Sequence, residues 1–169
     1  MDEKIIMCVD DEKVVLTSLV SQLKNTFGDE FEYETFMSAD DGWEFIDEIF
    51  AEGGDIELII CDWLMPRVRG DEFLIRVHQR FPDVPMIMLS GQADESAVQR
   101  AKNEAKLFRF VAKPWVKEEL MDVVKQALGM NADGGTATDD TPPAKSDTKD
   151  DASSDDPPKP PMPGFLPGA

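Results

Sequence analysis

The segment IIMCVDDE at residues 5–12 decides the fold, because a short apolar run passes directly into three consecutive acidic residues. Five apolar residues in a row are typical of a strand that is covered on both faces, as in a parallel sheet. Similar short apolar runs recur along the chain. They predict further strands at residues 56–61, 85–89 and 107–111, and a weaker one at residues 31–37.

Amphipathic helical segments lie between these runs. Apolar residues recur at steps of three and four in the segments 16–27, 43–50, 73–81 and 120–127, which places them on one face of a helix. A further helix, predicted over residues 94–105, offers mostly alanine for burial and should be weakly anchored. This alternation predicts a (βα)5 α/β domain. Its sheet is expected to be parallel, five-stranded and doubly wound, in the flavodoxin-like order 2-1-3-4-5.

The composition of the chain changes near Gly129. Residues 130–169 contain eight of the twelve prolines and few large apolar side chains. Such a segment cannot bury enough apolar surface to offset the entropy lost when a chain becomes ordered. The sequence therefore predicts one folded domain over residues 1–129 and a disordered tail, rich in proline and aspartate, over residues 130–169.

The charge of the chain argues against several classes of partner. With 17 basic and 35 acidic residues, the net charge is −18, which repels phosphate backbones and anionic lipids. Binding to nucleic acid or to a membrane surface is therefore not expected. No apolar run reaches the ~20 residues of a membrane-spanning helix, and the acidic first residues do not resemble a secretory signal. Cys8 and Cys61 lack metal-ligand spacing, which favours a reducing, cytoplasmic location.

Three carboxylates are predicted to meet at one edge of the sheet. Asp10 and Asp11 follow the first strand and Asp62 follows the third. In this strand order, both strands end at the switch point where ligands bind. Carboxylates packed together repel one another, so the pKa of at least one should rise unless a cation is present. Oxygen ligands of this kind suit Mg²⁺ or Mn²⁺, although each aspartate alone would also fit a helix cap or a turn.

Two further strands bring other polar groups to the same edge. The fourth strand runs into Ser90 and Gly91, which supply a hydroxyl and an open backbone N–H, and the fifth runs into Lys113. Taken alone, the lysine would be only a structural ion pair. Together with the carboxylates, these groups suit the capture of a phosphoryl group, whose oxygens are neutralised by cations while a carboxylate attacks in line.

Four short motifs occur in a specific order: VDDE at 9–12, DWLMP at 62–66 with Gly70 after it, LSG at 89–91 and AKPW at 112–115. With these motifs, residues 4 to about 128 resemble the receiver domains of two-component response regulators, and in particular the stand-alone receivers of the chemotaxis type. The resemblance implies the same sheet order that the alternation of elements predicts.

The resemblance implies that Asp62 is the phosphoacceptor. Ser90 then hydrogen-bonds a phosphoryl oxygen, and Lys113 pairs with the phosphoryl group. Phe110, three residues before the lysine, takes the position of the aromatic switch residue, whose ring turns inward when Ser90 is drawn toward the phosphoryl group. The surface formed by the fourth helix, the fifth strand and the fifth helix is expected to change with it, as a two-state population shift that one local charge biases.

The resemblance also implies a metal site and two positions that tune phosphoryl lifetime. Mg²⁺ or Mn²⁺ is expected to bind Asp10, Asp11 and Asp62, together with the backbone carbonyl of Leu64. The lifetime positions lie two residues after the acceptor and two residues after the hydroxyl, which are Leu64 and Gln92 here. Their net effect on lifetime is left open.

Side chains near these motifs carry weaker expectations. Trp63, next to the predicted acceptor, is expected to be partly exposed. Arg67 and Arg69, in the loop that follows, are expected to be solvated. His78 is the only histidine, and it is expected on a helix away from the acidic edge, so it is not taken as a phosphotransfer group.

We therefore expect a phosphorylation-controlled signalling module without an output domain of its own. A sensor histidine kinase or a histidine phosphotransfer protein is the expected donor. The output is either binding of a downstream protein to the face of the fourth helix, fifth strand and fifth helix, or onward phosphorelay, and the sequence leaves both open. Homodimerisation through the same face also stays open. Beyond capturing the phosphoryl group and losing it slowly, the domain is not expected to act as an enzyme.

Other functions fit the motifs less well. An aspartyl-phosphate phosphohydrolase of the haloacid-dehalogenase type would need Asp-x-Asp after the first strand, whereas the candidate nucleophile here follows the third. A flavodoxin-like cofactor binder would need a phosphate-binding loop, but residues 10–13 are mostly acidic. A degenerate pseudo-receiver that binds its partner constitutively is disfavoured by the complete residue set.

Overall fold

The computed structural model describes residues 4–91 and 95–130, apart from the side chain of Ala97. Over these residues, strands and helices alternate as the sequence predicts. The strands are β1 (Lys4–Val9), β2 (Glu32–Phe36), β3 (Asp55–Asp62), β4 (Met86–Ser90) and β5 (Arg109–Ala112). The helices are α1 (Lys13–Phe27), α2 (Ala39–Ala51), α3 (Gly70–Arg80), α4 (Glu95–Glu104) and α5 (Lys117–Ala127). The expected disorder of the tail falls on residues that, after Met130, lie outside the described ranges.

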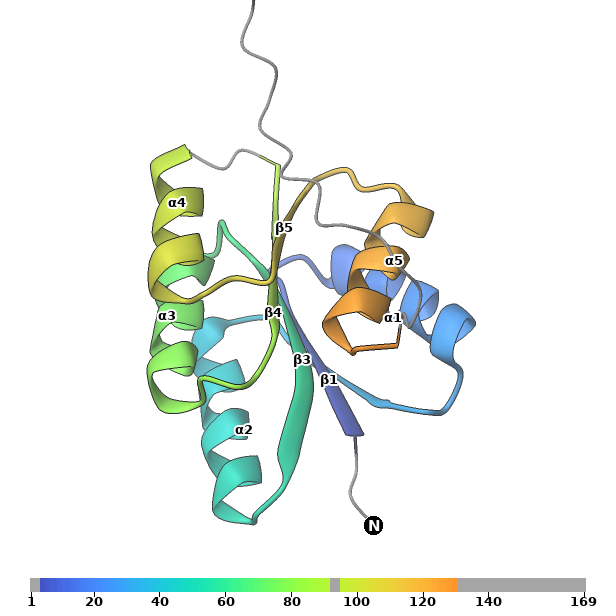
Figure 1. The fold of residues 1–169 in the computed structure, drawn as a ribbon, viewed down its shortest axis with the longest axis horizontal. Coiled ribbons are helices and arrows are strands. Elements are labelled where there is room, and N and C mark those ends of the chain that lie inside the picture. Colours follow the sequence, from blue (N-terminus) through green and yellow to red (C-terminus); the bar gives the residue numbers. More distant parts are fainter. Residues whose placement is uncertain (1–3, 92–94, 131–169) are drawn as a thin grey trace, which may run out of the picture. The chain divides into compact units, whose positions relative to one another are not determined.

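The five strands form one parallel sheet in the order β2-β1-β3-β4-β5 (Figure 1). This is the predicted order, and it is confirmed. In the register between β1 and β3, Val9 lies opposite Cys61. The residues that follow Val9 therefore leave the sheet at the same edge as Asp62, which ends β3. The topology itself thus brings the first and second acidic motifs together.

The helices cover both faces of the sheet, with α1 and α5 on one side and α2, α3 and α4 on the other (Figure 1). Each face has its own core, because every second residue of β1 and β3 points the same way. The buried residues that helices α1 and α5 contribute are Leu16, Leu19, Leu23, Leu120, Met121 and Val124. Among the described residues, no helix combines the length and the apolar character that crossing a membrane requires.

All five strands differ by one or two residues from the predicted ranges, and the differences in β4 and β5 concern the site. β4 includes Ser90, so the predicted hydroxyl lies on the last residue of the strand itself. β5 begins at Arg109, two residues later than the apolar run suggests. The cause is the end of α4: Lys106 adopts a left-handed φ of 46°, and the Leu107 N–H donates to the Ala101 carbonyl at 3.4 Å. Leu107 therefore completes a helix end and is buried in the core, although it lies outside the strand.

Helix α4 is anchored by small side chains, as its composition predicts. Ala101 and Ala105 are buried, and Val98 is half-buried against the same core. Two alanines bury far less apolar area than the leucines of α1, and the hydrophobic stabilisation scales with that area. Polar contacts between α4 and its neighbours therefore carry a larger share of its attachment than they do for α1.

Candidate functional site

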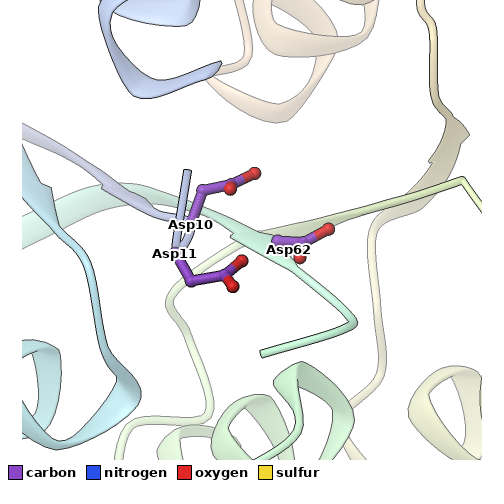
Figure 2. Close-up of side chains that lie close together, drawn as sticks. All are labelled: Asp10, Asp11 and Asp62. Carbon is purple, nitrogen blue, oxygen red and sulfur yellow. The ribbon is translucent and has the colours of Figure 1, made fainter. Parts of the chain in front are cut away.

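The three predicted carboxylates meet at the carboxyl edge of the sheet (Figure 2). Asp10 and Asp11 follow β1 directly, and Asp62 is the last residue of β3. One oxygen of each carboxylate lies within 4.8 Å of the others. Asp10 is 1% exposed and Asp62 is 5% exposed, whereas Asp11 is half-buried on the outer side. We call these three residues the acidic triad.

The geometry rules out the simpler explanation of the acidic pair as a helix cap. The residue that caps the N-terminus of α1 is Glu12, and its side chain makes no capping hydrogen bond. Asp10 instead accepts a hydrogen bond from the Glu12 backbone N–H, at 2.8 Å to Oδ1. This bond fixes the rotamer of the Asp10 carboxylate and leaves its other oxygen directed toward the site.

Lys113, the residue directly after β5, contacts two members of the acidic triad. Its ammonium lies 2.7 Å from Asp10 Oδ2 and 2.9 Å from Asp62 Oδ1. Its backbone N–H donates to the Ser90 carbonyl at 2.8 Å, which ties the loop after β5 to the end of β4. The backbone of the lysine is thus held by a contact that is separate from its two side-chain ion pairs.

Burial and mutual charge shift the pKa values of two of these groups. Burial raises the pKa of the Asp62 carboxyl; the hydrogen bond and the charge of Lys113 lower it, and the charges of Asp10 and Asp11 raise it, leaving a net increase. Burial by itself lowers the pKa of the Lys113 ammonium. Hydrogen bonds to Asp10 and Asp62, with the charges of both, outweigh that effect and raise this pKa. The raised pKa of Asp62 thus comes first from its burial, whereas the raised pKa of Lys113 comes from the two carboxylates that surround its ammonium.

The other predicted site residues lie where the sheet topology puts them, as far as they are described. Ser90 is 3% exposed at the end of β4. Phe110 is half-buried on β5, opposite Met88 of β4, and packs against the core that α4 shares. Leu64 is 59% exposed beside the acceptor position. Gln92 lies outside the described residues.

The loop after Asp62 folds back tightly against the strand it leaves. The Gly70 N–H donates to the Trp63 carbonyl at 2.8 Å, and a Cβ placed on Gly70 would lie 2.0 Å from the Asp62 carbonyl oxygen. Only glycine allows this approach. Trp63 itself is buried, so the expectation of partial exposure is wrong: its backbone N–H donates to the Leu89 carbonyl at 2.8 Å, and its ring packs into the core.

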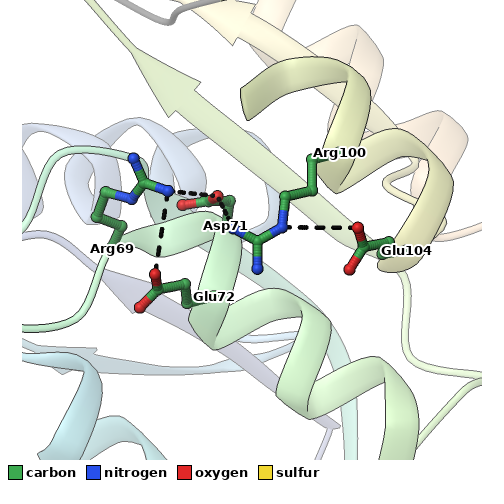
Figure 3. Close-up of polar contacts among 5 residues, drawn as sticks. All are labelled: Arg69, Asp71, Glu72, Arg100 and Glu104. Atoms are coloured by element: carbon green, nitrogen blue, oxygen red, sulfur yellow. Dashed lines mark hydrogen bonds and ion pairs between the residues drawn. The ribbon is translucent and has the colours of Figure 1, made fainter. Parts of the chain in front are cut away.

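Figure 3 shows a polar cluster, formed by Arg69 in the loop before α3 and by residues of α3 and α4, that the sequence did not predict. Asp71 is fully buried and accepts from Arg69 at 3.3 Å and from Arg100 at 3.5 Å. The expectation of solvation is confirmed for Arg67, whose side chain is 84% exposed, whereas Arg69 keeps 43% of its side chain exposed and also pairs with Asp71. An acid in the first turn of a helix usually interacts with the helix dipole at the surface. That pattern hides the burial of Asp71.

The acidic triad has the donor chemistry of a magnesium site. All its side-chain ligands are carboxylate oxygens, which hard divalent cations prefer. Three carboxylates and the Lys113 ammonium carry a formal charge of −2 in total. A divalent cation would balance that charge. The residues present therefore fit Mg²⁺ or Mn²⁺.

Comparison with known proteins shows what the sequence of the chain is similar to. The family described as the response regulator receiver domain matches residues 6–125. The hydrogenase transcriptional regulatory protein HoxA of Cupriavidus necator is 33% identical over 123 residues, covering 73% of this chain and 24% of HoxA. The chain thus spans about a quarter of the length of this regulator and of its Bradyrhizobium diazoefficiens counterpart. A chemotaxis protein CheY homolog of Campylobacter jejuni is 25% identical over 134 residues, covering 78% of this chain and 98% of that protein.

Solved structures share the fold. The signal receiver domain of an HD domain-containing protein from Pseudomonas fluorescens has a TM-score of 0.67 and 26% identity, covering 76% of this chain and 89% of that one. A CheY-like response regulator receiver domain protein from Methanospirillum hungatei has a TM-score of 0.66 and 26% identity, covering 75% of this chain and 94% of that one. Receiver domains are phosphoacceptor signalling domains that bind Mg²⁺ in an acidic pocket. With the predicted sheet order, the acidic triad and the match over residues 6–125, this chain belongs to the response regulator receiver domain family.

Proposed function

We propose that this receiver accepts a phosphoryl group on the Asp62 carboxylate and signals through the modified form. The observation that carries the proposal is the position of Lys113, whose ammonium bridges Asp62 and Asp10 beside the acidic triad. A cation fixed at this point can pair with a phosphoryl oxygen as soon as the carboxylate has captured it. The position of this ammonium supports a nucleophilic role for the buried Asp62 rather than a purely structural one.

The donor is a phosphohistidine of a sensor histidine kinase or of a histidine phosphotransfer protein. An Asp62 oxygen forms the new P–O bond while the P–N bond to the imidazole breaks, and the imidazole leaves as the neutral ring once it carries a proton. A groove of about 480 Å³ beside Lys113, between α1 and the loop after β5, supports docking of such a partner. Val14, which lines this groove, is 81% exposed and is therefore available for contact with a partner.

Different residues around Asp62 stabilise different parts of the negative charge on the phosphoryl group. Lys113 pairs with one phosphoryl oxygen, and the Ser90 hydroxyl donates a hydrogen bond to another. Asp10, Asp11 and Asp62, with the backbone carbonyl of Leu64, would hold Mg²⁺ or Mn²⁺. When bound, such an ion neutralises negative charge on the transferring phosphoryl group. Because the groups come from four different strand ends, they stand in place before the donor arrives.

The output passes through Ser90 and Phe110. Movement of Ser90 toward the phosphoryl group vacates space beside β4, and the Phe110 ring, which is half-buried, turns into it. The surface formed by α4, β5 and α5 then changes. Phe108 and Val116 are exposed apolar side chains next to β5 and α5, which supports binding of a downstream protein there. Onward transfer to a histidine phosphotransfer protein would use the same Asp62 phosphoryl group.

Leu64 and Gln92 tune how long the phosphoryl group lasts. Leu64 is largely exposed at the mouth of the site, so its side chain stands in the path of a water that would attack the phosphorus. Gln92 follows Ser90 by two residues in sequence and acts on the same water. Exchange of Leu64 for a small side chain should therefore shorten the lifetime.

Intact-mass spectrometry after incubation with acetyl phosphate and Mg²⁺ tests the proposal directly. We expect one phosphoryl adduct that depends on Mg²⁺ and is absent from Asp62→Asn. If acetyl phosphate gives no adduct, beryllofluoride with Mg²⁺ is added as a stable mimic, and a response that Asp62→Asn lacks supports the proposal. Failure of both reagents would refute it. Rapid turnover of a phosphomonoester would instead favour the phosphohydrolase, which the position of Asp62 on β3 opposes.

A further inference from the structure

An ionic cluster centred on one buried carboxylate links the loop after the acceptor to α4 (Figure 3). Its centre is Asp71, in the first turn of α3, whose side chain is 0% exposed. Arg69 Nη2, from the loop, and Arg100 Nη1, from α4, both approach Asp71 Oδ2, at 3.3 and 3.5 Å. Asp71 Oδ1 has no hydrogen-bond partner among the described residues. One carboxylate oxygen thus serves two guanidinium groups on different elements.

We propose that the Asp71–Arg100 contact holds α4 in the position of the unmodified protein, so that its strength sets how readily phosphorylation rearranges the output surface. The inference rests on the proposed function, since it concerns the regulation of that site. Asp71 and Arg100 are positioning residues, because they act on the placement of α4. They touch neither the phosphoryl group nor the acidic triad.

The acceptor side of the link is rigid. Gly70, the residue before Asp71, packs against the Asp62 backbone so closely that even a methyl group would not fit, and it donates to the Trp63 carbonyl. The Arg69 guanidinium also lies 5.9 Å from the centre of the Trp63 ring. A change in the backbone around Asp62 therefore reaches Asp71 over a single residue.

The α4 side of the link is the weaker attachment, which makes it the side that moves. Apolar anchoring of α4 among the described side chains comes from Ala101, Ala105 and the half-buried Val98. Arg100 adds the cross-helix contact to Asp71, and its other partner, Glu104 at 3.6 Å, lies on α4 itself. With so little apolar area, one ionic contact is a substantial part of what holds the helix.

The geometry of the contact is suited to breaking. Both nitrogen-to-oxygen distances are at the long end of the hydrogen-bond range, and half of the buried carboxylate is unsatisfied. Arg69 remains on Asp71 when Arg100 leaves, so the buried carboxylate does not lose all its compensation. Release of α4 therefore avoids the full penalty of an unpaired buried charge.

Arg100→Gln tests this link, with Glu104→Gln as the matched control, since it removes the other partner of Arg100 without touching Asp71. Hydrogen exchange of the α4 amides is measured in the unmodified proteins, and the beryllofluoride concentration at half-saturation is measured with Mg²⁺ present. We expect α4 exchange to rise about tenfold in Arg100→Gln and half-saturation to fall by a similar factor, while the control stays near wild type.

A second variant, Asp71→Asn, keeps the size of the side chain and removes its charge. Together with Arg100→Gln it forms a double-mutant cycle. We expect the α4 exchange rate and the beryllofluoride half-saturation of the double variant to be close to those of the single variants. Unchanged α4 exchange in Arg100→Gln, additive effects in the cycle, or an equal effect of Glu104→Gln would each overturn the proposal. A wild-type protein without any beryllofluoride response would refute the proposed function, whereas a normal wild-type response with an unshifted Arg100→Gln refutes only the coupling.

Discussion

The Lys113 ammonium lies 2.9 Å from the Asp62 carboxylate, at the point where β3 and β5 end on the same edge of the sheet. The pair relieves part of the repulsion within the acidic triad, but the pKa of Asp62 remains raised. When empty, such a site lowers the free energy of unfolding. The same arrangement favours the binding of a cation or the capture of a phosphoryl group.

Asp62→Asn is expected to stabilise the fold at neutral pH in metal-free buffer. The pKa of Asp62 is higher in the folded protein than the ordinary 3.8, so ionising this carboxyl costs folding free energy. That cost is complete above the raised pKa and vanishes below 3.8, so the advantage of the Asn variant should disappear as the pH falls through this window. Urea denaturation at several pH values measures it, and a less stable variant at pH 7 would contradict the argument.

Lys113→Met is expected to destabilise the domain by about 3 kcal/mol, because removing one partner of a buried ion pair leaves the others uncompensated. The carboxylates of Asp10 and Asp62 would then face each other without the ammonium between them. Added Mg²⁺ should recover much of the loss. The free energy of unfolding with and without Mg²⁺ measures both effects, with Lys102→Met on the surface of α4 as the control. Equal losses in the two variants would show that Lys113 has no special role in stability.

Asp11→Ala is expected to weaken Mg²⁺ binding by at least about tenfold. It removes the outermost carboxylate of the acidic triad, and even residues that only support a ligand cost about that much when mutated. The fold should be unaffected, since Asp11 is half-buried and the hydrogen bond to the Glu12 N–H comes from Asp10. Isothermal titration calorimetry gives the dissociation constant. Asp29→Ala, an exposed acid after α1, is the control, and an affinity equal to that of the control would remove Asp11 from the ligand set.

Gly70→Ala is expected to impair both folding and phosphoryl capture. The added methyl group would lie 2.0 Å from the Asp62 carbonyl oxygen, so the loop and the acceptor backbone must separate. Forcing extra volume into a packed site costs about 1–3 kcal/mol. Thermal unfolding and the acetyl phosphate adduct measure the two effects. At Gly91 a methyl group would meet Lys113 Cβ at an ordinary 3.8 Å, so Gly91→Ala should stay folded, and equal losses at both positions would argue against the close approach.

The fold was predictable because its signals are local and repeat along the chain. The apolar run before Asp10 and the helical spacing from Leu16 onward each indicate one element, and their alternation leaves few topologies. The meeting of Asp10, Asp11 and Asp62 followed from the same topology, since the carboxyl ends of parallel strands share an edge. The roles of these residues came from the resemblance of the motifs, and remain proposals.

What the sequence did not predict depends on contacts between distant segments. Asp71 looks like a surface acid at a helix start, and its burial results from Arg100, which approaches from another helix. Trp63 looks exposed because it follows the last residue of the predicted strand, yet the loop after it folds back through Gly70. The late start of β5 depends on the left-handed turn at Lys106. No periodicity in the sequence encodes any of these relationships.

The acidic triad exists only in the folded chain, because its members leave the sheet from two different strands. An unfolded chain scatters the same carboxylates and cannot bind an ion with them. Any ion that binds the triad therefore shifts the folding equilibrium by mass action, and each tenfold excess of free ion over the dissociation constant adds about 1.4 kcal/mol to stability. If Mg²⁺ or Mn²⁺ binds the triad, its free concentration sets the folded fraction of this protein before any phosphoryl donor is present.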